Sequence, residues 1–183
     1  MKLLAVNQLV SIIEEDCIER VLWVDIKSPG YIVIDIASKT ALPRFRTHAE
    51  LEAMACNGLL SFEAKDPFTY SIHEDTIDPR HRAIRDKNWQ KISPLILQQP
   101  AIFWPKQRGD LIASHIAGES HVPYYRLLRR YWQRGMTRNA PFLRSFGVCI
   151  HSRKNASRLH IINIDPRPER WFLLWINHGM AQT

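Results

Sequence analysis

Three arginines beyond the middle of the chain have the type and spacing needed to contact a polyanion. Arg126, Arg130 and Arg134 are each four residues apart, so they share one side of an α-helix that turns about 100° per residue. The other side is apolar and consists of Tyr125, Leu128 and Trp132. Guanidinium groups bind phosphates and pair bidentately with guanine. The pattern predicts a helix that packs by its apolar side and presents arginines to the major groove of double-stranded DNA.

An ordinary solvated helix face is the alternative interpretation, because runs of charge on helices usually lie in solvent. Arginines on such faces are commonly paired with an acid four residues away. Here Glu119 is the only acid between Gly118 and Arg144. The missing acidic partners favour nucleic-acid binding.

Other chemistries have weaker support in the sequence. His115 and His121 could ligate a metal or transfer protons, but no cysteine or carboxylate stands at ligand spacing from them. Nucleotide-binding loops, nucleophile elbows and metal motifs are absent, so we predict no catalytic residues, no metal and no cofactor. Six tryptophans could stack on single strands, but Trp89 and Trp132 fall on predicted apolar stripes, which favours the core.

The arginines need neighbouring helices to hold them in place. The sequence of residues 79–135 predicts three helices. The first helix covers 79–92 and kinks or ends just before Pro94. The second covers 105–117, and Gly118 separates it from a third at 120–135 with Ser120 as N-cap. Two helices joined by a short glycine-containing turn, with the second rich in arginine, predict a helix-turn-helix.

Nine residues of this arrangement are candidate DNA contacts. They are Arg126, Arg130, Arg134, Tyr124, Ser120, His121, Lys106, Arg108 and Arg138. The first three lead, and the next three lie near the helix start, where recognition helices commonly meet bases. The lysine and arginine of the preceding helix are expected on the DNA backbone, and the last arginine on a phosphate or in the adjacent minor groove.

The N-terminal part alternates short β-rich runs with turns. Residues 21–26 (VLWVDI) and 31–36 (YIVIDI) flank a Ser-Pro-Gly turn, which predicts a hairpin, with a further strand at 8–14. A helix is predicted at 47–57, with Thr47 and Glu50 as a capping box and Gly58 at its end, before a short strand at 59–62. We therefore predict an α+β chain with a small β-rich, partly open barrel at 1–70 and a linker at 71–79. A helix-turn-helix domain at 80–140 and a divergent tail at 141–183 follow.

Charge and composition narrow the class of protein. Of the net +7, residues 1–70 carry −3, residues 71–147 carry +7 and residues 148–183 carry +3, so a polyanion would bind beyond the first seventy residues. The longest apolar run has six residues, at 171–176, too few to cross a bilayer. Acids at Glu14, Glu15 and Asp16 argue against a signal peptide, so we predict a cytoplasmic protein with no membrane partner. The three cysteines are widely spaced and are expected to be free thiols.

The run YYRLLRRYWQRGMTRNA, residues 124–140, resembles the segment after the helix-turn-helix of TnsB-type transposases. These are DDE recombinase subunits of cut-and-paste transposons related to phage Mu transposase. Residues 85–97 (RDKNWQKISPLIL) resemble the helix before that motif, and residues 41–70 the end of the family's N-terminal β-rich module. Residues 5–140 are covered.

The resemblance implies sequence-specific binding of double-stranded DNA at the repeats of transposon ends, in DNA transposition and recombination by a mobile element. Strand transfer in that family belongs to a downstream RNase H-type domain with three carboxylates and magnesium. We expect that domain to be absent, because residues 148–183 contain only Asp165 and Glu169 as acids.

Alternatives to DNA binding at transposon ends remain open. The acidic β-rich half would be the docking module in a protein that binds other transposition proteins. A chain of this kind would also inhibit transposition if it occupied the transposon ends. The tail after residue 141 does not resemble the family, and it would be an out-of-frame remnant or would form a strand at 159–164 and an apolar closing segment at 171–176.

Overall fold

The computed structural model of this chain describes residues 4–26, 28–62, 66–68, 77–116 and 118–141. Residues 71–76 of the linker predicted at 71–79 and the features predicted beyond residue 141 lie outside the described residues. Sheet and helices both occur, which confirms the predicted α+β class.

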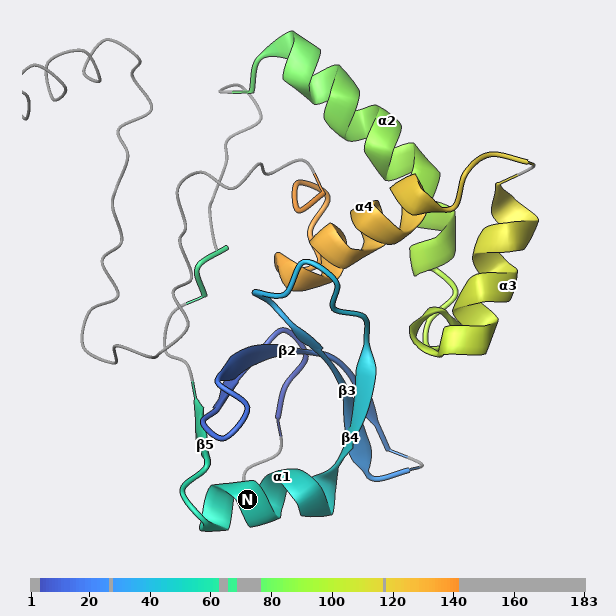
Figure 1. Cartoon of the computed structure of the whole chain (residues 1–183). Helices are drawn as coiled ribbons and strands as arrows, with labels where there is room; N and C mark the ends of the chain where they lie inside the picture. Colours follow the sequence, from blue (N-terminus) through green and yellow to red (C-terminus); the bar gives the residue numbers. More distant parts are fainter. Residues whose placement is uncertain (1–3, 27, 63–65, 69–76, 117, 142–183) are drawn as a thin grey trace, which may run out of the picture. The chain divides into compact units, whose positions relative to one another are not determined.

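Five short strands form one antiparallel sheet in the order β4-β3-β2-β1-β5 (Figure 1). Their bounds are β1 Leu9–Ile12, β2 Cys17–Asp25, β3 Gly30–Asp35, β4 Arg44–Thr47 and β5 Leu60–Phe62. The hairpin of 21–26 and 31–36 is confirmed as the β2–β3 pair, and the strands near 8–14 and 59–62 as β1 and β5. Closure of the sheet into a barrel stays a prediction.

Strand β4 was not predicted, because its sequence RFRT has one apolar residue between two arginines. It pairs with β3 at close range. A Cβ on Gly30 would lie 2.3 Å from the Phe45 ring and 2.7 Å from the carbonyl oxygen of Arg46, so this register needs glycine at position 30.

Both faces of the sheet are covered by apolar clusters. Neighbouring residues of a strand point to opposite sides of a sheet, and alternate residues of β3 join different clusters. On β3, Tyr31 and Val33 join one apolar cluster with Leu51 of α1 (His48–Cys56). Ile32 and Ile34 join a second cluster, which contains the apolar residues of the later helices. In Figure 1 the sheet accordingly lies between α1 and α4.

Helix α1 begins and ends as its sequence predicts. The Thr47 side chain accepts a hydrogen bond from the Glu50 backbone N–H at 3.1 Å, the N-cap half of the predicted capping box. Gly58, just beyond the helix, has φ +69°, a conformation that favours glycine.

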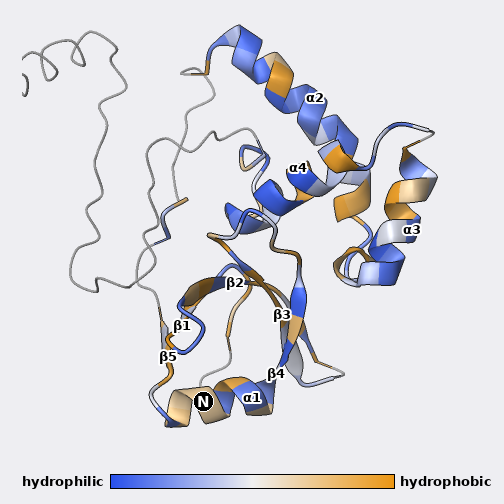
Figure 2. Cartoon of the chain, in the orientation of Figure 1, coloured by the Kyte–Doolittle hydropathy of each residue, from blue (hydrophilic) through white to orange (hydrophobic). Residues whose placement is uncertain are grey.

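Three longer helices and a short 3-10 turn follow. They are α2 Pro79–Ile96, η2 Ala101–Phe103, α3 Pro105–His115 and α4 Val122–Gln133. Helix α2 runs two residues beyond Pro94, so the prediction that it could end before this proline was wrong. Figure 2 shows the outer part of α2 as mostly hydrophilic, with hydrophobic residues gathered where α2 lies beside α4.

The helices pack on the sheet through the second cluster. Trp132 of α4 contacts Phe103 with ring centroids 5.9 Å apart, and Phe103 in turn contacts Trp23 of β2 at 6.4 Å. Trp132 is fully buried and Trp89 partly buried in this core, which confirms core packing for both tryptophans. All of the described residues belong to one compact unit.

Candidate nucleic-acid interface

Helix α4 carries the predicted contacts, and its buried side differs from the predicted one. The buried stripe consists of Tyr124, Leu127, Leu128, Tyr131 and Trp132, spaced for one side of a helix. Tyr125, expected on that stripe, is only half-buried. Six of the positions 124–132 are aromatic or leucine. The sequence therefore allows two different apolar sides of the helix, one with Tyr124 and one with Tyr125. Packing buries the side with Tyr124.

The start of α4 is exposed. Val122 is 69% exposed, and Ser120, His121 and Arg126 are also exposed. Arg126 makes no hydrogen bond or ion pair within the part of the chain that the structure describes. Together with Tyr125 and Arg129, the side chains of His121, Val122 and Arg126 line an open depression. An exposed guanidinium beside a hollow is suited to contact a phosphate or a base edge.

Helix α2 adds positive charge next to this start. Lys91 Nζ lies 2.8 Å from Glu119, which also accepts a hydrogen bond from the Tyr124 hydroxyl at 3.2 Å. The bond from Lys91 lowers the pKa of Glu119, with a smaller contribution from Lys87. Lys87 is exposed and, within the described residues, forms no ion pair. Lys87 was not among the predicted contacts, because only the fold brings α2 beside the turn before α4.

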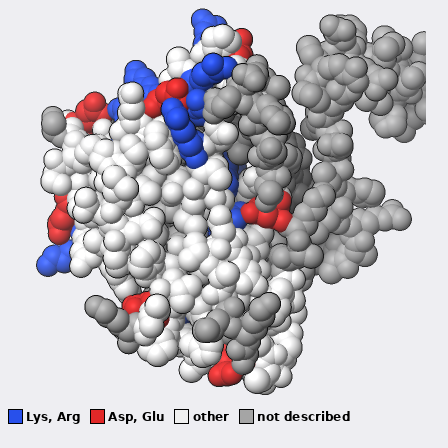
Figure 3. Space-filling view, turned by 180° about the vertical axis from the view of Figure 1, so that it is seen from behind, with Lys and Arg blue, Asp and Glu red and all other residues white. Residues whose placement is uncertain are grey.

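Figure 3 shows that Lys and Arg side chains gather over the upper part of the molecule, where Figure 1 places α2. The lower part of that view, over the sheet, is mostly uncharged. The distribution agrees with the sequence-based partition of charge, in which the excess of lysine and arginine begins after residue 70.

The expected continuous row of exposed arginines was wrong at its C-terminal end. Arg130 and Arg134 are half-buried. The Arg134 guanidinium lies 5.7 Å from the Phe68 ring centroid, and its buried Nη1 has no hydrogen-bond partner in the part of the chain that the structure describes. Burial lowers the pKa of Arg134, and the neighbouring charge of Arg130 lowers it further. Only Arg126 of the three is fully presented to solvent.

The sheet covers the side of α4 that the sequence left for solvent. Arg129 donates hydrogen bonds to the carbonyl oxygens of Lys39 and Ala41 at 2.6 and 2.8 Å. Gln133 is buried and donates to the carbonyl oxygens of Asp35 and Ser38 at 2.8 and 2.7 Å. The C-terminal half of α4 is therefore held on the loop after β3.

Two other candidates are buried, contrary to the exposure expected of a DNA contact. Tyr124 is 4% exposed, and burial, followed by the charge of Glu119, raises its pKa. Arg108 is 2% exposed and donates to the Phe103 carbonyl oxygen at 2.9 Å. Burial lowers the pKa of Arg108, which stacks 5.9 Å from the centroid of the Tyr125 ring. Both side chains shape the core that supports the interface.

The remaining candidates lie on the surface. Lys106 is exposed near the start of α3. Ser120 does not cap α4 as predicted, because the helix begins at Val122, although Ser120 Oγ accepts a 3.4 Å hydrogen bond from the Val122 N–H. Arg138 pairs with Asp86 at 3.0 Å and keeps about half of its side chain exposed.

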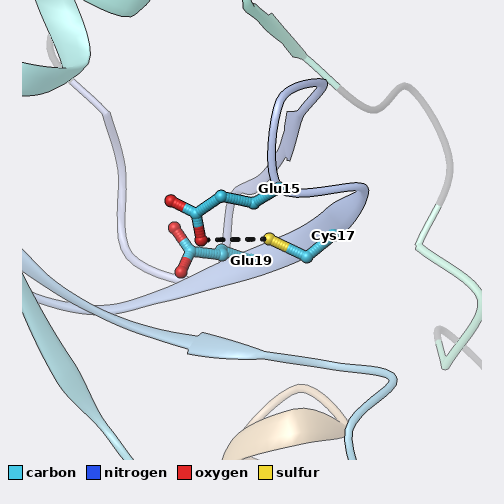
Figure 4. A group of neighbouring side chains, drawn as sticks. All are labelled: Glu15, Cys17 and Glu19. Carbon is cyan, nitrogen blue, oxygen red and sulfur yellow. Dashed lines mark hydrogen bonds between the residues drawn. The ribbon is translucent and has the colours of Figure 1, made fainter.

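A separate cluster on the sheet, Glu15, Cys17 and Glu19, brings three possible metal ligands together (Figure 4). Both carboxylates are already bound by arginines: Arg44 and Arg46 each pair with Glu15 and with Glu19. Burial and the nearby acids raise the pKa of Cys17 to about 12, whereas a metal needs the thiolate. The cluster is an ion-pair network that links β2 to β4.

Comparison with known proteins shows which family these domains belong to. Residues 3–67 match the TnsB N-terminal SH3-like domain, and residues 85–142 match the TnsB second domain. The chain carries two TnsB domains. It is 33% identical over 116 residues to transposon Tn7 transposition protein TnsB of Escherichia coli, an alignment that covers 61% of this chain and 16% of that protein.

The resemblance found in the sequence is thereby confirmed. The sheet belongs to the TnsB N-terminal SH3-like domain. Helices α3 and α4, and α2 from Arg85 onward, belong to the TnsB second domain, which thus contains the candidate interface. Neither domain match reaches beyond residue 142. Among the described residues, no helix is both long and apolar enough to span a membrane.

Proposed function

We propose that this chain binds double-stranded DNA sequence-specifically at transposon ends, and that α3, the turn at 118–121 and α4 act as its helix-turn-helix. The placement of α4 carries the proposal. Its C-terminal half is fixed on the sheet, while its first turns are exposed with Arg126 and have lysines of α2 beside them. Recognition helices of this motif contact bases mainly through their N-terminal residues.

The proposed contacts divide into base readers and backbone binders. Arg126 is placed to read guanine or bind a phosphate, and Val122 to contact a thymine methyl group. Ser120 and His121 lie beside them at the helix start. Lys87 and Lys106 are exposed on the preceding helices and would bind phosphates, which fix the register without reading sequence.

The decisive experiment selects bound duplexes from a random pool at two salt concentrations. Base readout predicts one enriched motif that persists at the higher salt, whereas charge alone predicts weak binding of all sequences that falls steeply with salt. A pool without an enriched motif at either salt would contradict the proposal.

Two single-charge variants separate the two kinds of contact. Arg126→Ala is expected to lower affinity for the selected site by about 1 to 3 kcal/mol and to relax preference at one position. Lys106→Ala, its charge-matched comparison, is expected to weaken selected and random duplexes alike and to reduce the salt slope by about one. Equal losses on both duplexes for Arg126→Ala would count against base readout.

A second candidate function, docking of another transposition protein on the sheet, has one observation in its favour. Ile13 and Phe62, beside and on β5, are each 51% exposed, and β5 is an edge of the sheet. Loss of partner capture by full-length Phe62→Ser, with unchanged DNA binding, would support this second function.

A further inference from the structure

We infer that Arg20, in the TnsB N-terminal SH3-like domain, is a positioning residue for the DNA-reading helix of the second domain. The inference rests on the proposed function and adds to it a requirement: the sheet must hold the C-terminus of α4 for the helix start to read sequence. Arg20 lies on β2 and is fully buried.

The Arg20 guanidinium joins three segments that are distant in the sequence. Its Nε donates to the carbonyl oxygen of Gln133, the last residue of α4, at 3.2 Å. Its Nη1 and Nη2 form a bidentate ion pair with Asp66 at 2.5 and 2.8 Å. Nη1 also contacts Asn7, at 3.3 Å from both its carbonyl and its side-chain oxygen.

Arg20 acts on α4 as a capping group from another domain. The last carbonyl groups of a helix lack partners within the helix, and the helix dipole makes this end negative. A buried guanidinium at this end satisfies a free carbonyl and complements the dipole. The Asp66 carboxylate compensates the charge, without which burial of the arginine would be costly.

Neighbouring contacts hold the same end of α4. The Asn7 side chain donates to the Gly135 carbonyl oxygen at 3.0 Å, and the Gln133 side chain donates to Asp35 and Ser38. Consecutive buried residues Tyr131, Trp132 and Gln133 span about 200° of the helix. This end of α4 is therefore enclosed by core on one side and by sheet on the other.

The contrast with Arg46 shows what is particular to Arg20. Arg46 is also a buried arginine of the sheet, but the three acids that it binds, Glu15, Glu19 and Glu50, all belong to the SH3-like domain. Arg46→Met therefore provides a matched control that removes a buried guanidinium without touching α4.

The test compares Arg20→Met, Arg20→Lys, Gln133→Leu and Arg46→Met in the full chain. Each is assayed by circular dichroism for folding and by titration with the selected duplex and with a random duplex. We expect Arg20→Met and Gln133→Leu to lower the ratio of selected to random affinity about 10-fold, with random binding changed less than 2-fold. Arg20→Lys should restore part of the ratio, since it keeps the charge and loses the bidentate geometry. Arg46→Met should leave the ratio unchanged even where it lowers the melting temperature.

A readout without DNA separates this inference from the proposed function. Amide hydrogen exchange of residues 130–134 is expected to accelerate at least 10-fold in Arg20→Met and Gln133→Leu and to be unchanged in Arg46→Met. If the wild-type chain selects no sequence, the proposed function fails, and with it the role in reading. If it selects a sequence and Arg20→Met, or a folded Arg20→Lys chain, keeps the wild-type ratio and exchange, the positioning role of Arg20 is overturned while DNA binding stands. An unfolded Arg20→Met chain together with a folded Arg20→Lys chain of wild-type ratio and exchange would also overturn it, since Arg20 would then only stabilise the core.

Discussion

The two ends of α4 lie in different surroundings although both are rich in arginine and aromatic residues. At the start, His121, Val122 and Arg126 face solvent beside the lysines of α2. At the end, Gln133 is enclosed, and Arg134 has a buried nitrogen that no described residue contacts by a hydrogen bond. Sequence composition does not distinguish these ends. The sheet and the loop after β3 distinguish them, because they cover the C-terminal end of α4 and leave its start exposed.

The largest expected effect tests the enclosed end. Trp132→Ala removes a fully buried ring that packs on Phe103, and it should lower the free energy of unfolding by about 3 to 5 kcal/mol. Val122→Ala, at the exposed start of the same helix, should change it by less than about 0.5 kcal/mol. Urea denaturation followed by circular dichroism measures both. If both variants lose a similar amount of unfolding free energy, the two ends of α4 do not differ in burial as described.

Arg134 offers a sharper test of the enclosed end. Its buried Nη1 lacks a hydrogen-bond partner among the described residues, and burial lowers its pKa, so keeping the guanidinium charged in this place reduces the free energy of unfolding. Arg134→Met keeps a long side chain against Phe68, and methionine packs well on aromatic rings. We expect the free energy of unfolding to rise by about 1 kcal/mol.

DNA titration of the same variant completes this test. Arg134→Met should weaken the selected duplex less than Arg126→Ala does. A loss as large as that of Arg126→Ala would show that the enclosed end also contacts DNA, and the division of α4 would have to be abandoned.

Local sequence signals predicted the elements well and the exposure of single residues poorly. The β2–β3 hairpin and the Thr47 cap depend on neighbouring residues only, and both were found where predicted. The burial of Arg108 and Arg134 depends on Phe103 and Phe68, whose proximity no helical period encodes. Lys87 was missed for the same reason, since its place beside the turn before α4 is a tertiary contact.

The TnsB resemblance did not resolve these exposures either. A family motif over residues 124–140 places arginines on a helix but does not say which neighbours cover them. Arg126 kept its predicted exposure because the depression at the start of α4 is open and the loop after β3 lies toward the other end. A candidate site can therefore be located from sequence more readily than its individual contacts.

The smallest expected effect concerns the single acid at the open end. Glu119 binds Lys91 and the Tyr124 hydroxyl, and it places a negative charge on the surface proposed to meet DNA. Glu119→Gln keeps an oxygen that can accept both hydrogen bonds and removes the charge. Affinity for any duplex should rise a few-fold, and the salt slope should steepen by about 0.9.

Glu14→Gln provides the matched control for this variant, because Glu14 is an exposed acid of the SH3-like domain, outside the helices proposed to meet DNA, without a partner in the described part of the chain. Salt screens charges beyond about 10 Å at 0.1 M, so only an acid near the bound phosphates should matter. Titration at several salt concentrations compares the two slopes. If Glu14→Gln raises affinity as much as Glu119→Gln, the gain reflects net charge alone, and the open end of α4 has no special part in binding.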